Sequence, residues 1–275
     1  MKRCAWIDAH EESRMKVLGE TRYRVFGSAA FRGNPVTLFE VDMLDDRTAL
    51  LQAAQRSGTI DNVFFTSIDG GPVKARFFSS TAELWLCGHG LLALSHHLHV
   101  PGVSSAREVL SPCGSWQIHA DVHAPRVSMP VQRAIEITDP AHWLKQDLDC
   151  IGIEHERLYE APNGVWIVVL RDMPDLLGID AGTVAALPSD HGTPGALIAT
   201  LRLPDSGYGF RYFAPWHGKP EDCGTGSAHC YLAPLMIGSS APVTALQFGP
   251  EGVAEMRVSL RDDAVAVSGR VDLCS

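Results

Sequence analysis

The chain has 275 residues, of which 45% are hydrophobic and 20% charged, and its formal net charge is −9. This length suits two domains of ordinary size, and this balance is typical of a soluble globular protein. The negative charge disfavours nucleic acid and anionic membranes as partners. No apolar run is long enough to span a membrane, and the N-terminus becomes charged too early for a secretory signal. We therefore expect a cytoplasmic protein.

The N-terminal half is predicted to consist mostly of strands. A charged, aperiodic extension covers residues 1–20. Periodicity and turn residues then predict strands 23–26 and 36–41, helix 46–56, strands 63–68, 73–78 and 82–86, and helix 91–99. The last of these helices is apolar nearly all round, so we expect it to be buried with strands wrapped about it.

The C-terminal half repeats this style after a crossover predicted near residues 114–122. Its predicted elements are strands 115–119 and 127–131, helix 141–148, strand 165–170, helix 175–186, strands 196–203 and 208–213, helix 227–237, and strands 253–260 and 264–271. Strands far outnumber helices in both halves, which favours an α+β fold.

The seven cysteines have neither zinc spacing nor the pattern of a disulfide framework. In the reducing compartment expected for this chain, most cysteines are small core residues. We interpret Cys4, Cys113, Cys150 and Cys274 in this way, and favour core packing for Cys230 too. No adequate set of metal ligands is found, so we expect neither a metal nor an organic cofactor.

Two cysteines stand apart because each opens a Cys-Gly-x-Gly motif, at Cys87 and at Cys223. The second copy follows the first by about half the chain. Each copy comes after an aromatic strand opened by an arginine, Arg76 or Arg211, and each opens a predicted helix. Two halves built alike, each with a thiol and glycines at a helix start, predict one symmetric pocket between them.

Such a pocket suits proton transfer next to a carboxylate. Helix starts present free amides and a positive dipole end, and glycines allow a ligand to approach closely. We therefore assign substrate binding to residues 88–90 and 224–227. The same field favours thiolates, and two thiolates across one cavity repel, which gives a base on one side and an acid on the other. The alternative is that both cysteines only pack before buried helices.

Other side chains near the motifs have two interpretations each. His89 lies in the first loop, where general acid or base catalysis is favoured over a structural role. Asp222 precedes the second cysteine and is either a catalytic group or a helix cap. Ser227 either donates a hydrogen bond to substrate or simply occupies the first turn of the helix.

Longer motifs resemble the PhzF-like proteins of the diaminopimelate epimerase-like superfamily. The resemblance covers nearly the whole chain from Tyr23 and rests on residues 31–35, 81–89, 213–215, 220–222 and 225–229. It implies two pseudo-symmetric halves, each a curled, mostly antiparallel sheet around a central helix, with the active site in the cleft between them. We expect the first half over residues 1–118, with strand 262–275 returning to it, and the second over residues 119–261.

The resemblance also implies site residues. The family's Gly-His falls on Gly88-His89, and its Asp and Ser fall on Asp222 and Ser227. The family's glutamate is matched by Asp61, which is one methylene shorter, and Asn34 of the first motif is assigned to substrate binding.

One departure points to a different mechanism. Cys223 follows Asp222 in place of the usual residue, which resembles diaminopimelate epimerase and proline racemase, enzymes that use one cysteine from each half. Cys87-Gly88-His89-Gly90 resembles the first-site motif of the racemases.

The leading hypothesis is a cofactor-independent isomerase that shifts a double bond in a small amino-acid-like carboxylate of specialised metabolism, such as an antibiotic pathway. Its catalytic set would be Asp61, His89 and Asp222, assisted by Cys87 and Cys223. The alternatives are a two-cysteine amino-acid epimerase or racemase and a non-catalytic carboxylate-binding protein. Exposed sheet edges in such folds often pair, which favours a homodimer.

Overall fold

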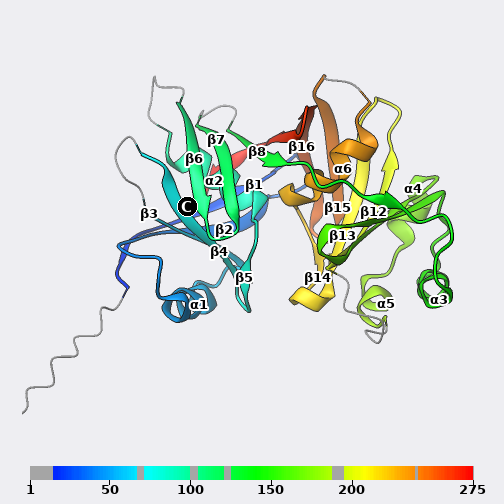
Figure 1. The fold of residues 1–275 in the computed structure, drawn as a ribbon, viewed down its shortest axis with the longest axis horizontal. Coiled ribbons are helices and arrows are strands. Elements are labelled where there is room, and N and C mark those ends of the chain that lie inside the picture. Colours follow the sequence, from blue (N-terminus) through cyan, green and yellow to red (C-terminus); the bar gives the residue numbers. More distant parts are fainter. Residues whose placement is uncertain are drawn as a thin grey trace, which may run out of the picture.

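The computed structural model describes residues 15–66, 71–99, 105–120, 125–187, 195–238 and 241–274. These residues form two lobes of strands, and each lobe curls around one helix (Figure 1). No helix in the described ranges is both long and apolar enough to cross a membrane. Cys4 and the end of the strand predicted over residues 63–68 lie outside these ranges.

The first lobe contains strands β1 to β8 and helices α1 and α2. Their bounds are β1 Val17–Val25, β2 Asn34–Val41, α1 Arg47–Arg56, β3 Asp61–Thr66, β4 Val73–Ser79, β5 Glu83–Leu84, α2 Gly88–His97, β6 Ser105–Ser111, β7 Gly114–Ala120 and β8 Arg126–Pro130.

The remaining elements build the second lobe and the return of the chain to the first. Their bounds are β9 Ile135–Glu136, α3 His142–Cys150, β10 Arg157–Ala161, β11 Val165–Val169, α4 Met173–Gly178, α5 Ala181–Ala185, β12 Ala196–Arg202, β13 Tyr208–Ala214, β14 Lys219–Asp222, α6 His229–Met236, β15 Val243–Gly249, β16 Gly252–Arg261, β17 Ala264–Ser268 and β18 Val271–Leu273. Short 3-10 turns precede β11, β14 and α6.

Both lobes follow the same order of strand pairings. In the first, β2 and β3 are parallel, β3 and β4 antiparallel, β4 and β6 parallel, and β6 and β7 antiparallel. In the second, β11 and β12, β12 and β13, β13 and β15, and β15 and β16 repeat this series. The duplication predicted from the two Cys-Gly-x-Gly motifs is therefore present in the topology, and the α+β class is confirmed.

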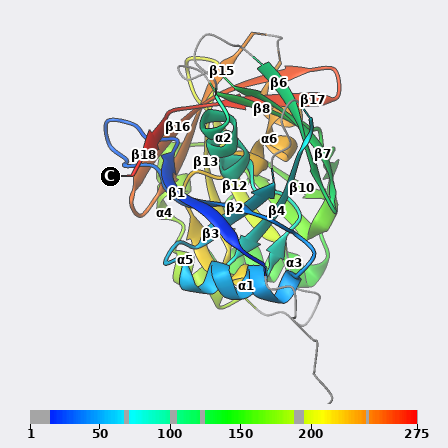
Figure 2. The ribbon, with the colours of Figure 1, turned by 90° about the vertical axis from the view of Figure 1, so that its left-hand side faces the viewer.

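Helix α2 occupies the middle of its lobe, as its all-apolar sequence predicts. Its residues 91–94 are fully buried, and it contacts strands on several sides, among them β2, β3, β7 and β8. Figure 2 shows the helix enclosed by these strands. Helix α6 is the counterpart in the second lobe and packs against β16 and β17. Each sheet thus closes over a helix whose surface has no polar face.

The change of lobe comes later than residue 118. Strand β7 runs across this expected boundary, and β8 pairs antiparallel with β7. At the end of the chain, β17 pairs with both β16 and β8, and β18 pairs with β1. The strand pairing therefore assigns residues 126–130 to the first lobe together with the C-terminal strand.

Three of the cysteines expected in the core are not buried, since Cys113 and Cys150 are exposed and Cys274 is partly exposed, whereas Cys230 is buried as expected.

Two predicted elements also differ from the structure. Strand β1 begins at Val17, because Val17 to Val25 pair with β2 although the segment lacks an alternating apolar pattern. The helix expected over residues 175–186 is instead two short helices, α4 and α5. The Asp180 side chain accepts a hydrogen bond from the amide of Thr183 and so starts a new helix there.

Each of the two matched arginines forms a bidentate ion pair with a glutamate of its own lobe. Arg76 contacts Glu83 at 2.7 and 2.9 Å, and Arg211 contacts Glu221 at 2.7 and 2.8 Å. Paired donors of this kind fix the angle between two segments as well as their distance. In each lobe, the pair fixes the strand that leads to the Cys-Gly-x-Gly motif against the strand that carries the arginine.

The two Cys-Gly-x-Gly helix starts touch each other through their backbones. A Cβ atom placed on Gly88 would lie 2.7 Å from the backbone nitrogen of Ser227 and 2.8 Å from the carbonyl carbon of Gly226. Real Cβ atoms do not approach backbone so closely, so only glycine fits at residue 88 in this arrangement. The close approach of the two lobes at the cleft depends on this contact.

We expect Gly88→Ala to destabilise the protein by about 1–3 kcal/mol, because the added methyl must push the two helix starts apart. Gly178→Ala is the matched control, since a Cβ there meets no atom within 4 Å. Urea unfolding followed by circular dichroism measures both. Equal unfolding midpoints for the two variants would show that the backbone contact at residue 88 is dispensable.

Candidate active site

A cleft lined by both lobes has a volume of about 320 Å³, near the lower end of small-molecule sites. From the first lobe it is lined by Asp61, Cys87, Gly88 and His89. From the second it is lined by Tyr212, Lys219, Asp222, Thr225 and Ser227. A larger, more open hollow of about 890 Å³ around Arg24, Arg32 and Arg270 contains none of the predicted catalytic residues.

A lysine bridges two carboxylates at the centre of this cleft. The Nζ atom of Lys219, on β14, donates to Oδ2 of Asp61 on β3 and lies 3.1 Å from Oδ1 of Asp222. The side chains are only 15%, 2% and 10% exposed, respectively. Within the described ranges, no group of three or more His, Cys, Asp or Glu side chains could hold a metal ion.

Asp222 is held by groups on several sides. Its Oδ2 accepts a hydrogen bond from the Thr225 hydroxyl at 2.6 Å, and its Oδ1 lies 3.4 Å from Nδ2 of Asn34. Burial by itself would raise the pKa of Asp222, but the Lys219 ammonium and the hydrogen bonds from Thr225 and Lys219 bring that pKa below its ordinary value. Asn34 does not line the cleft. Its amide nitrogen contacts Oδ1 of Asp222 and the carbonyl oxygen of Gly224, so Asn34, which we expected to bind substrate, supports Asp222 in this structure.

His89 extends from the first turn of α2 toward Asp61. Its Nε2 lies 3.5 Å from Oδ2 of Asp61, and its Nδ1 lies 3.6 Å from the sulfur of Cys87. Burial lowers the pKa of His89 below its ordinary value. The imidazole is therefore neutral at pH 7, so one ring nitrogen is a donor and the other an acceptor.

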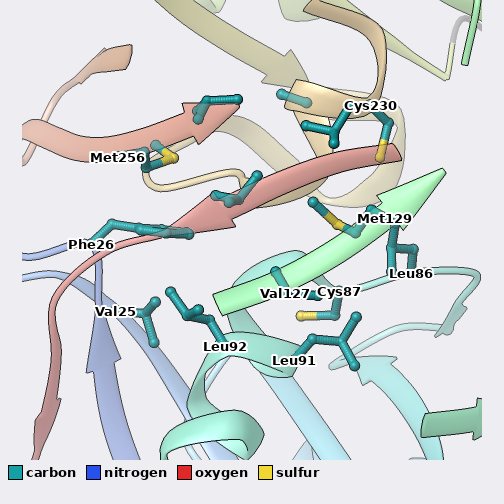
Figure 3. Packing of buried hydrophobic residues seen from close by; sticks show 14 of the residues in the cluster. Val25, Phe26, Leu86, Cys87, Leu91, Leu92, Val127, Met129, Cys230 and Met256 are labelled. Atoms are coloured by element: carbon teal, nitrogen blue, oxygen red, sulfur yellow. The ribbon is translucent and has the colours of Figure 1, made fainter. Parts of the chain in front are cut away.

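Cys87 lines the cleft but is also part of the apolar core, where Figure 3 shows it with Leu86, Leu91 and Met129. Its sulfur accepts a hydrogen bond from the amide of Gly90. Burial and then the nearby charge of Asp61 raise the pKa of Cys87 far above its ordinary value. The thiol therefore keeps its proton at neutral pH.

Cys223 lies outside the cleft lining. Its sulfur fills the space beside Gly249, where an added Cβ would be only 2.3 Å away. Consecutive residues of a strand point to opposite faces. Because Asp222 ends β14 with its side chain in the cleft, the next side chain points away from it. Burial raises the pKa of Cys223 to about 11, so the helix start does not make it a thiolate.

The amides of the two glycine loops are not equally available to a ligand. The side-chain oxygen of Gln247, on β15, accepts hydrogen bonds from the amides of Gly224 and Thr225. Neither Gly90, Gly224 nor Gly226 lines the cleft. Of the glycines predicted to bind substrate, Gly88 alone lines the cleft.

Sequence reasoning missed Lys219 and Gln247. Lys219 precedes a proline in a stretch that looks like a turn, and its partner Asp61 lies 158 residues away in the chain. Gln247 is buried in a strand that was not predicted. The available signal was the position of this glutamine between Leu246 and Phe248. An amide buried among apolar residues must find several hydrogen-bond partners.

Comparison with known proteins agrees with this architecture. Residues 23–249 match the PhzC-PhzF family model, described as phenazine biosynthesis-like protein. An "uncharacterized isomerase" of Pseudomonas aeruginosa is 27% identical over 260 residues, which cover 90% of this chain and 93% of the relative.

Solved structures share the fold. A putative phenazine biosynthesis PhzC/PhzF protein from Clostridium difficile superimposes with a TM-score of 0.76 at 21% identity, covering 93% of this chain and 96% of that one. A hydroxyproline epimerase from Agrobacterium vitis gives 0.58 at 11% identity, covering 96% and 92%. With a duplicated fold, a two-lobed cleft and a family match over most of its length, the chain belongs to the phenazine biosynthesis-like PhzC-PhzF family and is an isomerase.

Proposed function

We propose that the enzyme shifts a double bond in a small amino-acid-like carboxylate by moving one proton, with Asp61, His89 and Asp222 as the proton-transfer groups. The observation that carries this proposal is their convergence. Two carboxylates from opposite lobes and a neutral imidazole line one cleft of about 320 Å³. The family description supports a substrate from specialised metabolism.

The charges of the cleft suit a substrate with both a carboxylate and an ammonium group. The amides of Gly88, His89 and Ser227 stand at helix starts, which attract anions. Beside them, Asp61 and Asp222 face one ammonium, that of Lys219, so a negative charge remains uncompensated. A substrate ammonium placed there balances it.

The proposed reaction is redox-neutral. Asp61 takes a proton from a carbon of the unsaturated substrate, and the electron pair of that C–H bond moves into a new double bond conjugated with the carboxylate. The original double bond opens, and its far carbon takes a proton from the protonated Asp61, which returns to its carboxylate form. Neutral His89 donates a hydrogen bond to the charge that develops. Neither a metal nor an organic cofactor enters this scheme.

A two-cysteine epimerase is the second candidate, because Cys87 lines the cleft beside His89. The same structure weighs against it on two grounds. Cys223 is outside the cleft lining, and burial raises the pKa of both thiols, so neither is a ready base at neutral pH.

We expect deuterium to enter the far carbon of small unsaturated amino acids when the enzyme acts in heavy water, with the double bond displaced into conjugation with the carboxylate. NMR locates the deuterium and the double bond, and chiral chromatography measures inversion. Asp61→Asn and His89→Ala are expected to lose activity by about 10²-fold or more. Cys223→Ser is expected to keep most of it, because this side chain does not line the cleft.

Circular dichroism of each variant provides the control for folding. Inversion at the α-carbon that disappears in both Cys87→Ser and Cys223→Ser, with His89→Ala still active, would establish the two-cysteine epimerase instead.

We expect a small carboxylate such as acetate to bind the helix starts at millimolar concentration. Its titration should move the amide NMR signals of Gly88, His89 and Ser227. The signals of Gly224 and Thr225 should move little, because Gln247 already accepts from both amides. Equal shifts in both loops would contradict this asymmetry, and no shifts at all would remove the carboxylate site.

A further inference from the structure

We propose that Lys219 is a positioning residue of this enzyme, whose ammonium group keeps the Asp222 carboxylate charged and aligns it with Asp61 from the opposite lobe. The inference rests on the proposed function only in treating Asp61 and Asp222 as the reacting groups. The bridge itself is a property of the free protein. The family resemblance implies no role for this residue, and no sequence motif contains it.

The Lys219 ammonium lies between the two aspartates. One nitrogen atom contacts Oδ2 of Asp61 and Oδ1 of Asp222 at the same time, so the two carboxylates are near neighbours. They come from β3 and β14, which do not pair with each other. Two buried carboxylates at such a separation do not both stay ionised without a counter-charge, and one then takes up a proton. Lys219 supplies the counter-charge.

The surroundings leave this role to Lys219 among the described residues that line the cleft. The other titratable groups that line the cleft are Cys87, His89, Tyr212, Glu83 and Tyr231. Glu83 is paired with Arg76. Burial raises the pKa of Cys87 and of both tyrosines, so these groups stay protonated. Burial lowers the pKa of His89, which is a smaller source of positive charge for Asp222 than Lys219 is.

The lysine itself stays charged. Burial tends to lower the pKa of Lys219, but the charges of Asp222 and Asp61 raise it above its ordinary value. A permanently protonated lysine is neither a base nor a nucleophile at neutral pH. Its contribution is to hold Asp222 in its proton-accepting form and to fix the distance between Asp222 and Asp61.

The test uses carboxyl NMR titration of the free protein, labelled with ¹³C at the aspartate side chains. The Asp222 signal is identified by its loss in Asp222→Asn. In Lys219→Met, the pKa of Asp222 is expected to rise by about 1–3 units, whereas Lys219→Arg keeps it near the wild-type value. Lys145→Met is the control, because Lys145 is an exposed lysine paired with Asp139 at 3.5 Å.

The same titration for Asp222 in wild type and Lys219→Met would overturn the proposal. So would a Lys219→Arg variant shifted as far as Lys219→Met, since the charge would then be irrelevant. These NMR titrations need no substrate, so their outcome does not depend on whether the enzyme catalyses the proposed reaction. Once a substrate is in hand, the acid limb of the rate profile should move to higher pH in Lys219→Met and be restored in Lys219→Arg.

A wild-type measurement covers the case in which Lys219→Met does not fold. Reductive methylation at mildly alkaline pH should modify Lys145 rapidly and Lys219 slowly, because a protonated, buried amine does not react. Peptide mass spectrometry measures the two rates. Modification of Lys219 at the rate of Lys145 would show that the bridge does not persist in solution.

Discussion

The close contact between the two helix starts is the constraint on which the site depends. Gly88 lies against the backbone of Gly226 and Ser227 with no room for a side chain. This contact brings the N-terminal ends of α2 and of the turn before α6 to one place, although each helix is buried in its own lobe. The residues that flank the starts, His89 and Asp222, therefore face the same small volume. A looser junction would leave two half-sites separated by solvent.

At both helix starts, burial affects the pKa of the ionisable side chains more than the helix dipoles do. We had expected the dipoles to produce thiolates, but burial is the largest influence on the pKa of both Cys87 and Cys223, and it acts in the opposite direction. The same burial keeps His89 neutral. A side chain in the cleft stays charged where it directly contacts a group of opposite charge. This condition is met by Lys219 with its two aspartates.

Much of the fold followed from local patterns, and the site followed only in part. An all-apolar helix must be enclosed by other elements. Asp46 marks the start of α1, because its side chain accepts a hydrogen bond from the amide of Ala49. The repeated motif correctly indicated two similar halves. Local patterns could not predict which way Cys223 points, because that depends on where β14 ends. Nor could they predict the bridge from Lys219 to Asp61, which requires the pairing of strands far apart in the chain.

The return of the chain to its first lobe has a consequence for how the protein folds. Strand β18 pairs with β1, and β17 pairs with β8, so the first sheet is completed only by residues 264–273. During synthesis, the N-terminal lobe cannot close over α2 until almost the whole chain has left the ribosome. Contacts of such long sequence separation slow folding and leave apolar surface exposed meanwhile. The two lobes therefore have the same architecture but complete their folding at different times. The second can assemble from a nearly continuous stretch of chain, whereas the first needs the C-terminal strands.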